Sequence, residues 1–326
     1  MAKQQIELDL LIIGAGPAGL TAAIYATRSK LNAVILEEEL VGGQIRGSYS
    51  IENYPGFESI SGADLSDKIQ AHAVSLGAQI NDLGKIVSLS LSNEEKIIET
   101  DDVIYRPKAV IIATGATPRR LPVPEEANLH GKAIHYCELC DGPLYGNKDL
   151  VVVGGGNSAL QAAIFLTKYA RNITIIHQFD YFQGAKATQE QLHQNKNVNT
   201  IWNSEIRHVI GEKAIEKIIV ENVKTKETSE IKADGIFAYI GYVPKTDLFK
   251  DNIKLNQWRY IETDENMETN IKGVFAAGDV RSKTFRQITT AVNDGTIAAL
   301  AAEKYILEKG DVQHGESILN PNLSLV

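Results

Sequence analysis

Two stretches of the chain share one pattern of apolar and polar positions. In each, a short apolar run ends at glycine, a longer alanine-rich segment follows, and a second apolar run comes after it. Short apolar runs that flank a longer helical segment predict buried parallel strands joined by a helix. We expect this strand, helix and strand at residues 8–13, 20–27 and 33–36, and again at 150–153, 159–169 and 173–176.

The segments that follow these two units also correspond. Each unit leads into a region of alternating apolar and polar residues, typical of a β-meander, and then into a buried strand. We expect these meanders and strands at residues 85–99, 109–113, 206–231 and 235–240. The final strand and helix, at 273–277 and 289–307, have no glycine-rich unit of their own, so we expect them to complete the first domain.

This order of elements predicts an α/β fold with two Rossmann-like, three-layer ββα nucleotide-binding domains, the second inserted in the first. The predicted boundaries give a first domain of residues 1–117 and 246–326 and an inserted domain of residues 118–245. A proline-containing link starts the insertion at Pro118. The tail 309–326 is polar and ends in apolar residues, which predicts either disorder or an end that docks on the protein.

Composition narrows the class of partner. The 326 residues carry a net charge of −8 and contain no lysine or arginine tract, which argues against a nucleic-acid partner. The N-terminal residues do not resemble a secretory signal, and no run approaches the ~18 apolar residues of a membrane span. We therefore expect a cytoplasmic protein without a membrane segment.

The first glycine loop, residues 14–19, carries the G-x-G-x-x-G spacing of a dinucleotide site. Such a loop places a pyrophosphate on backbone N–H groups at a helix N-terminus. Glu37 ends the next strand at the spacing expected for a carboxylate that holds ribose hydroxyls. The residues predicted to bind a nucleotide here are Gly14, Gly16, Pro17, Ala18, Gly19 and Glu37.

The chain has two cysteines, Cys137 and Cys140, in a C-x-x-C motif between the two glycine loops. Zinc is a poor explanation, because a structural site takes about four ligands and the seven histidines supply no H-x-x-H partner motif. We therefore expect no metal. A close thiol pair next to nucleotide loops predicts a redox disulfide that exchanges with a partner through a mixed disulfide.

The second glycine loop keeps the G-x-G-x-x-A spacing, with Gly154, Gly156, Asn157, Ser158 and Ala159. The strand after it ends at His177, where an NAD-type site would place an acidic residue. Three aromatic residues follow. We expect Phe182 to pack in the core, and Phe179 and Tyr181 to offer a stacking surface in the second nucleotide site.

Several further motifs stand in a characteristic order: Gly42-Gly43-Gln44, Glu52-Asn53-Tyr54-Pro55-Gly56, Ala113-Thr114-Gly115, Gly278-Asp279 and Arg286-Gln287. Together with the first glycine loop and the segment 137–142, they resemble the low-molecular-weight thioredoxin reductase family over residues 7 to 308. The resemblance implies that the first site binds FAD and that the protein is a homodimer. It implies flavin contacts from Gln44 and Asn53, a ribityl contact from Asp279, and contacts to the pyrimidine edge from Gln287 and Ile288. The matching residues Gly43, Thr114, Gly115, Gly278 and Arg286 complete the implied FAD site.

For the cysteine pair, the resemblance implies that Cys140 faces the flavin and that Cys137 attacks the partner, while Asp141 carries a proton. The intervening Glu138 and Leu139 stand where the family commonly has small residues. A carboxylate between the thiols disfavours a thiolate, which predicts an altered redox potential. His135 is either a residue that tunes a thiolate or an ordinary polar neighbour.

The family's NADPH motif, H-R-R-x-x-x-R, is broken in this chain. Gln178, Phe179 and Gln183 replace the three arginines that would hold a 2′-phosphate, and Lys186 is a single substitute. The chain thus resembles a divergent branch of the ferredoxin-linked or diflavin-linked type. We expect a flavin-linked disulfide oxidoreductase that serves a thioredoxin-like protein or another dithiol and uses NADPH poorly, with ferredoxin as a possible donor.

Three alternatives remain open. One is a diflavin dithiol oxidase with a second FAD in the former NADPH site. Another is a conventional NADPH-dependent thioredoxin reductase, and the third is a non-catalytic redox sensor that retains FAD. In the family, the inserted domain swings on two short linkers; without a nicotinamide, that swing is predicted to be lost or changed.

Overall fold

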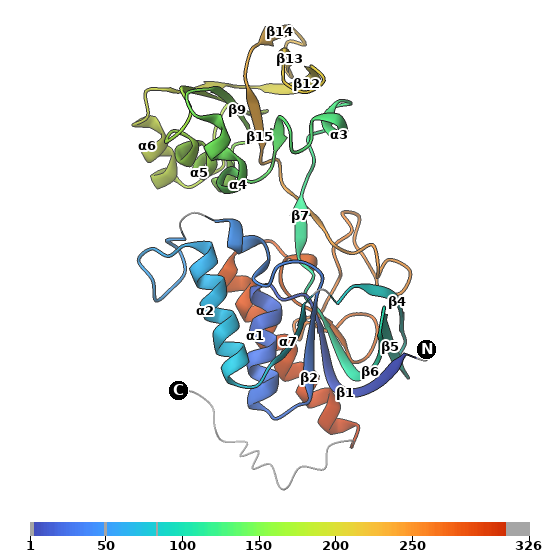
Figure 1. The fold of residues 1–326 in the computed structure, drawn as a ribbon. Helices are drawn as coiled ribbons and strands as arrows, with labels where there is room; N and C mark the ends of the chain where they lie inside the picture. The colour runs from blue at the N-terminus through green and yellow to red at the C-terminus, as the bar shows by residue number, and fades with distance from the viewer. Residues whose placement is uncertain (1–2, 49–50, 83, 311–326) are drawn as a thin grey trace. The chain divides into compact units, whose positions relative to one another are not determined.

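The protein is represented by a computed structural model that describes residues 3–48, 51–82 and 84–310. The chain divides into two compact units (Figure 1). Unit 1 comprises Met1–Ile45, Asp64–Gly115 and Pro244–Val326, and unit 2 comprises Arg46–Ala63 and Ala116–Val243. Most of the tail discussed above, residues 311–326, lies outside the described part.

Unit 1 is built on a sheet of seven strands in the order β3-β2-β1-β6-β5-β4, with β17 also paired to β6. Strands β1, β2, β3, β6 and β17 run parallel, whereas β4 and β5 add an antiparallel meander. The elements are β1 (Gln4–Ile13), α1 (Pro17–Arg28), β2 (Ala33–Glu37), η1 (Gly43–Gly47), α2 (Gly62–Ser75), β3 (Gln79–Asp82), β4 (Ile86–Leu91), β5 (Lys96–Thr100), β6 (Val103–Ile112), β17 (Val274–Ala276), η3 (Gly278–Val280) and α7 (Ile288–Glu308).

The side chains of β1 show why this sheet lies in the middle of unit 1. Successive residues of a strand point to opposite faces. Leu10 and Ile12 pack in a core with α1 and α7, while Leu11 and Ile13 pack in a second core with the meander strands. Because both faces are covered, the strand is a continuous apolar run rather than an alternating one.

Unit 2 repeats the plan with a parallel sheet in the order β11-β10-β9-β15-β8 and a separate antiparallel sheet of β12, β13 and β14. Leu150 and Val152 of β9 pack with helix α5, and Val151 and Val153 pack with the antiparallel sheet. The elements are β7 (Ala116–Pro118), α3 (Glu126–Leu129), β8 (Ile134–His135), α4 (Glu138–Asp141), η2 (Gly142–Tyr145), β9 (Asp149–Val153), α5 (Asn157–Leu166), β10 (Asn172–Ile176), α6 (Lys186–His193), β11 (Val198–Ile201), β12 (Ser204–Ile210), β13 (Lys217–Asn222), β14 (Thr228–Ile231), β15 (Gly235–Ala238) and β16 (Tyr242–Pro244).

The predicted fold class is confirmed: each unit has a Rossmann-like parallel sheet with helices on one face and a β-meander on the other. The sequence analysis missed four helices: α2, α6 and the four-residue helices α3 and α4. Helix α6 has few apolar residues, and α3 and α4 are too short to show a helical period. Within the described residues, no helix combines the length and apolar character that a membrane crossing needs.

Candidate functional site

The first glycine loop joins β1 to α1 in a geometry that only glycine allows at its start. Gly14 has φ +105°, and a Cβ there would collide with the Ala113 carbonyl oxygen. Gly16, the N-cap of α1, has open space where its Cβ would be. The loop is therefore closed against the sheet on one side and open on the side where a pyrophosphate meets the helix N-terminus.

Glu37 lies where the sequence placed it, at the end of β2. Its carboxylate accepts hydrogen bonds from the backbone N–H of Ala15, at 2.6 Å, and of Glu39, at 2.8 Å. The first of these bonds ties the strand-end acid to the glycine loop. A ribose bound next to the pyrophosphate would thus meet a carboxylate that is already oriented.

Three motifs that lie far apart in the sequence meet at the first glycine loop. A Cβ on Gly43 would come within 3.2 Å of Gly16, and one on Gly14 would come within 3.0 Å of the Thr114 nitrogen. A Cβ on Gly278 would come within 2.9 Å of Ala18. These close approaches hold the three motifs against the loop, whereas nothing lies within 4 Å of the position of a Cβ on Gly16. The residues present fit a dinucleotide such as FAD.

Asp279 lies in a charged network beside this loop. Its side chain is 3.4 Å from the Lys283 ammonium, which also lies 3.0 Å from the Asp294 carboxylate. Burial raises the pKa of Asp279, and the Lys283 charge opposes that rise. Asp294, on α7, is buried and also accepts a hydrogen bond from the backbone N–H of Gly278 at 3.1 Å. Asp294 thereby fixes the turn that presents Asp279.

The remaining residues implied for FAD are only partly gathered by the structure. Gln287 is the N-cap of α7 and forms a capping box with Thr290, so Ile288 opens the helix. The Arg286 guanidinium stacks 4.1 Å from the centre of the Tyr260 ring. Gly115 is the last residue of the second segment of unit 1, and Gln44 is in η1 of the same unit. Asn53 belongs to unit 2, and its contact with the flavin stays a prediction.

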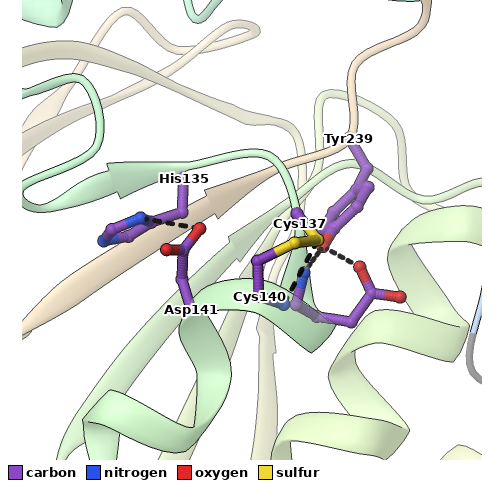
Figure 2. Close-up of a disulfide and its surroundings, with 6 residues drawn as sticks. His135, Cys137, Cys140, Asp141 and Tyr239 are labelled. Atoms are coloured by element: carbon purple, nitrogen blue, oxygen red, sulfur yellow. Dashed lines mark hydrogen bonds and ion pairs between the residues drawn. A yellow bond between two sulfur atoms is a disulfide. The ribbon is translucent and has the colours of Figure 1, made fainter. Parts of the chain in front are cut away.

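Cys137 and Cys140 form a disulfide at the start of helix α4 (Figure 2). Cys137 is the N-cap, and its sulfur accepts a hydrogen bond from the backbone N–H of Cys140 at 3.2 Å. Within the chain Cys137 is half-buried and Cys140 is exposed. A donor aimed at the Cys137 sulfur stabilises that sulfur as a thiolate once the disulfide opens.

Glu138 does not point freely toward the sulfurs but is tied to Tyr239. The Tyr239 hydroxyl donates to the Glu138 carboxylate at 2.5 Å, and the Glu138 backbone N–H donates back to that hydroxyl at 3.1 Å. Burial raises the pKa of Glu138, which the Tyr239 hydrogen bond partly offsets. The burial that favours the neutral form of Glu138 weakens the electrostatic penalty on a neighbouring thiolate.

Asp141 faces a buried histidine on the neighbouring strand. The distance from Asp141 Oδ2 to His135 Nδ1 is 3.1 Å (Figure 2), and His135 Nε2 is 2.8 Å from the Tyr145 hydroxyl. The His135 side chain is 1% exposed, and burial lowers its pKa although Asp141 opposes that shift. The structure thus gives His135 a direct contact with the predicted proton carrier. In the described part of the chain, no cluster of three His, Cys, Asp or Glu side chains could hold a metal ion.

A cavity of about 530 Å³ lies in unit 2 over the second glycine loop. Gly154, like Gly14, has positive φ (+129°), and a Cβ there would collide with the Tyr239 carbonyl oxygen. Gly156, the N-cap of α5, is open toward the cavity side. The predicted residues that line the cavity are Gly154, Gly156, Asn157, Ser158, Ala159 and His177.

His177 is a buried part of the cavity wall rather than a free ligand group. A Cβ on Gly155 would overlap its imidazole ring, and the ring is surrounded by Phe179, Phe182 and Trp202. The residue is 4% exposed and burial lowers its pKa, so the ring is neutral at physiological pH. It does not replace the carboxylate that Glu37 supplies in unit 1.

The aromatic residues after β10 are divided between core and surface. Phe182 packs in the core against Trp202, as expected. Phe179 and Tyr181 stack on each other with ring centres 5.8 Å apart, and they are 37% and 58% exposed. Neither lines the cavity. The two rings thus lie outside the cavity wall, and their role in the second nucleotide site stays a prediction.

The family model for pyridine nucleotide-disulphide oxidoreductases matches residues 8–295 of the chain. The chain belongs to this family. It is 70% identical over 304 residues to a Clostridium pasteurianum protein described as a 34.2 kDa protein in the rubredoxin operon, and covers 99% of that protein with 93% of its own length. It is 43% identical over 305 residues to the thioredoxin reductase of Peptoclostridium acidaminophilum. This match covers 91% of the present chain and 96% of that enzyme. A crystal structure of Lactococcus lactis thioredoxin reductase matches with a TM-score of 0.90 and 39% identity, over 92% of this chain and 99% of that one.

These findings confirm a thioredoxin reductase-like, FAD-dependent disulfide oxidoreductase. Membership in a branch without NADPH arginines stays a prediction. For this member of the pyridine nucleotide-disulphide oxidoreductase family, the cavity in unit 2 is the place where that prediction must be judged.

The sequence analysis missed the charged groups of that cavity. Arg119 and Arg207 are the arginines among its described lining residues, and Arg207 is already paired with Glu205 at 2.8 Å and with Glu221 at 2.9 Å. Lys186, considered earlier as a substitute, does not line the cavity. Arg207 lies on β12 at a register shift between Ile206 and His208, an irregularity that the alternating sequence pattern does not show.

Proposed function

We propose that the protein passes electrons between FAD in unit 1 and the Cys137–Cys140 pair, and then to a thioredoxin-like protein, without efficient use of NADPH. The observation that carries the last point is the charge of the cavity in unit 2. Its described lining contains Arg119 and an Arg207 that two glutamates already neutralise, where a 2′-phosphate needs unpaired guanidinium groups.

Unit 1 would hold FAD through the open N-terminus of α1. The backbone N–H groups after Gly16 would bind the pyrophosphate, and Glu37 would bind a ribose. Asp279, oriented through Lys283 and Asp294, would hold the ribityl chain. When bound, the flavin supplies two-electron chemistry matched to a disulfide. We propose this division of labour together with the domain limits 1–117 with 246–326, and 118–245.

In unit 2 the cysteines carry the exchange. The backbone N–H of Cys140 stabilises a Cys137 thiolate, which supports Cys137 as the sulfur that attacks the partner. Cys140 would then be the sulfur that communicates with the flavin, and Asp141 the proton carrier. A thioredoxin-like protein is the partner that relatives named thioredoxin reductase support.

Two donors compete for the place of NADPH. Ferredoxin would deliver electrons to the flavin without entering the cavity. A second FAD would place its pyrophosphate on the open Gly156, which the intact second loop allows, and would turn the protein into a dithiol oxidase. The exposed pair of Phe179 and Tyr181 gives the second FAD little support, because it does not line the cavity.

The decisive experiment counts flavins per chain and follows flavin bleaching anaerobically with NADPH, with NADH, with reduced ferredoxin and with a dithiol. We expect one flavin per chain, slow bleaching by both pyridine nucleotides and rapid bleaching by ferredoxin. Fast bleaching by NADPH with one flavin would overturn the proposal in favour of a conventional reductase. Two flavins, both bleached by dithiol, would establish the oxidase.

We also propose a cytoplasmic homodimer, from the resemblance to the family. Sedimentation of the purified protein tests the oligomeric state, and fractionation of cells tests the location. Scattering in the oxidised and reduced states tests whether the units rotate. A large rotation would contradict the expectation that the swing is lost when nicotinamide is not used.

A further inference from the structure

The cavity of unit 2 has a carboxylate on its wall. Glu205 is the acidic residue among the described residues that line this cavity. It lies on β12, and its side chain keeps 39% of its surface exposed although it pairs with Arg207. The cavity volume of about 530 Å³ lies within the ~300–1,000 Å³ of small-molecule sites. Glu205 is therefore within reach of a molecule that is bound there.

A backbone hydrogen bond places Glu205 beside the end of strand β10. The backbone N–H of Ser204 donates to the His177 carbonyl oxygen at 2.9 Å, and Glu205 is the next residue of β12. In a dinucleotide-binding unit, the end of this strand is where an acidic residue binds the ribose hydroxyls. Glu37 has that place in unit 1. In unit 2, Glu205 brings a carboxylate to the same end of the sheet from a different strand.

His177 leaves the strand end itself uncharged. Its ring is buried, which lowers its pKa, and a Cβ on Gly155 of the glycine loop would come within 2.4 Å of its Nε2. Among the described residues, this Nε2 has no hydrogen-bond partner. The charges next to the strand end are therefore those of Glu205 and of the Arg207 that is bound to it.

The ion pairs around Arg207 favour a ribose hydroxyl over a phosphate at this part of the wall. The Arg207 guanidinium lies 2.8 Å from Glu205 and 2.9 Å from Glu221, which also lies 3.5 Å from the Lys226 ammonium. A 2′-phosphate carries about −1.5 to −2 charges and would compete with both glutamates for Arg207. A hydroxyl is a donor, and an ionised carboxylate has about four acceptor sites. Glu205 can thus accept from a ribose while it remains bound to Arg207.

The rest of the lining fits the other parts of a nucleotide. Gly156 is open at the N-terminus of the ten-residue helix α5, where backbone N–H groups can bind a diphosphate. Tyr136 and Tyr239 line the same cavity. Their hydroxyls donate to Glu126 at 3.0 Å and to Glu138 at 2.5 Å, so both rings are held in place. An aromatic face stacks on any base, which suits the base of a nucleotide.

We propose that the cavity of unit 2 binds a nucleoside diphosphate with a free 2′-hydroxyl, and that Glu205 accepts hydrogen bonds from its ribose. The diphosphate binds at the N-terminus of α5. This group occurs free as ADP, and it is also one half of NADH and of FAD. The inference rests on the proposed function, in which the cavity does not select NADPH. It adds the class of ligand that the cavity does select.

Two ligands that differ only in the 2′-phosphate test this selectivity. ADP-ribose and 2′-phospho-ADP-ribose are titrated by calorimetry into the holoenzyme with its FAD, and neither ligand can reduce the flavin. We expect ADP-ribose to bind at least about tenfold more tightly, because only its free hydroxyl gains a hydrogen bond to the charged Glu205. Equal affinities, tighter binding of the 2′-phosphate, or no binding of either ligand overturns the proposal.

The two glutamates that bind Arg207 provide a matched pair of variants. Both lie within 3 Å of its guanidinium, but only Glu205 is among the described residues that line the cavity. Glu205→Gln should weaken the binding of ADP-ribose about tenfold, whereas Glu221→Gln should stay within about twofold of wild type. Equal weakening in both variants would assign the effect to Arg207 and overturn the proposal. Thermal melts and flavin content show that each variant is folded.

Further titrations identify the source of the group and separate this inference from the function on which it rests. ADP that binds as tightly as ADP-ribose supports the free diphosphate as the ligand, whereas at least tenfold tighter binding of NADH or FAD supports a dinucleotide. If neither ADP-ribose nor its 2′-phosphate binds and NADPH bleaches the flavin slowly, only this inference fails. If the 2′-phosphate binds more tightly and NADPH bleaches the flavin rapidly, the proposed function fails as well.

Discussion

The two glycine loops of this protein are nearly the same in their backbone and different at the end of the next strand. Gly14 and Gly154 both have positive φ, and both press against a carbonyl oxygen of a neighbouring segment of their sheet. In unit 1 the strand ends at Glu37, whose carboxylate is bound to the loop. In unit 2 it ends at His177, whose ring is buried against Gly155.

The difference shows that binding a pyrophosphate and selecting one nucleotide over another depend on different parts of the structure. The loop depends on backbone N–H groups and close packing, which small residues preserve. Selectivity depends on the side chains at the strand end and on charge around the ribose, which can change without disturbing the loop. Unit 2 has the first property, and the proposal above is that it lacks the charge pattern that supports the second for NADPH.

The largest expected effect comes from a matched pair at the open glycines. Gly16→Val and Gly156→Val each add a side chain where the protein has free space, so both variants should fold. Gly16→Val blocks the pyrophosphate and should lower the flavin content at least about tenfold. Gly156→Val should retain one flavin per chain and its turnover with a non-pyridine donor. Absorbance ratios of flavin to protein decide this, and equal losses in both variants would show that both loops are occupied.

The second largest effect concerns the buried charge network of unit 1. Asp294→Ala leaves Arg281 without its carboxylate and Lys283 with Asp279 alone, and breaking such a group costs about 3–5 kcal/mol. We expect a lower unfolding midpoint for unit 1 and weaker flavin retention, measured by denaturation with flavin fluorescence. As a control, Asp180→Ala removes an exposed pair with Lys224 in unit 2 and should change stability by less than about 1 kcal/mol.

The third prediction concerns positive charge added to the cavity of unit 2. Gln178 and Gln183 line it, and the double variant Gln178→Arg with Gln183→Arg adds two guanidinium groups. Each charge-assisted hydrogen bond contributes ~1.5–3 kcal/mol, so kcat/KM for NADPH should rise about 100-fold. NADH has no 2′-phosphate, and its kcat/KM serves as the matched control. A parallel rise with NADH would mean that the arginines act on the pyrophosphate instead.

The smallest effect concerns the buried acid of unit 2. The pKa of Glu138 is raised on folding, so its contribution favours the folded state at low pH and is lost as the pH rises through the folded value. Glu138→Gln should therefore gain unfolding temperature relative to wild type as the pH increases from 5 to 8. The lowered pKa of Glu99 favours the folded state above its ordinary value, and this contribution is lost as the pH falls below that value. Glu99→Gln should therefore be less stable than wild type at pH 6 and approach it as the pH falls from 5 to 3. Thermal melts from pH 3 to pH 8 test both directions.

Much of the fold could be predicted because it depends on local pattern. The inner strands of both parallel sheets carry apolar runs, whereas the edge strands β3 and β11 are half polar and were not predicted. The glycine loops begin the helices α1 and α5 within three residues of the expected starts. Helix α6 was not predicted, because the segment Lys186–His193 buries only Leu192. A helix held by one buried side chain has no apolar stripe to detect.

The site was less predictable, because its decisive contacts join residues that are distant in sequence. Glu37 was found from its spacing, whereas the bond between Glu138 and Tyr239 spans 101 positions. Asp294 lies in the middle of a helix and gave no sign of its role, although Gly295 beside it marks where α7 packs on the backbone of Ala18. Such contacts depend on how elements pack, which neither spacing nor composition encodes.

The Cys137–Cys140 disulfide also allows the electrons taken up by the protein to be counted from its free thiols. The chain holds two cysteines, and both are in this bond. Every free thiol that a reagent finds therefore reports on one redox centre, with zero per chain in the oxidised state and two after a single two-electron event. An accounting of thiols against bleached flavin can thus follow each electron pair through the enzyme without any engineered label.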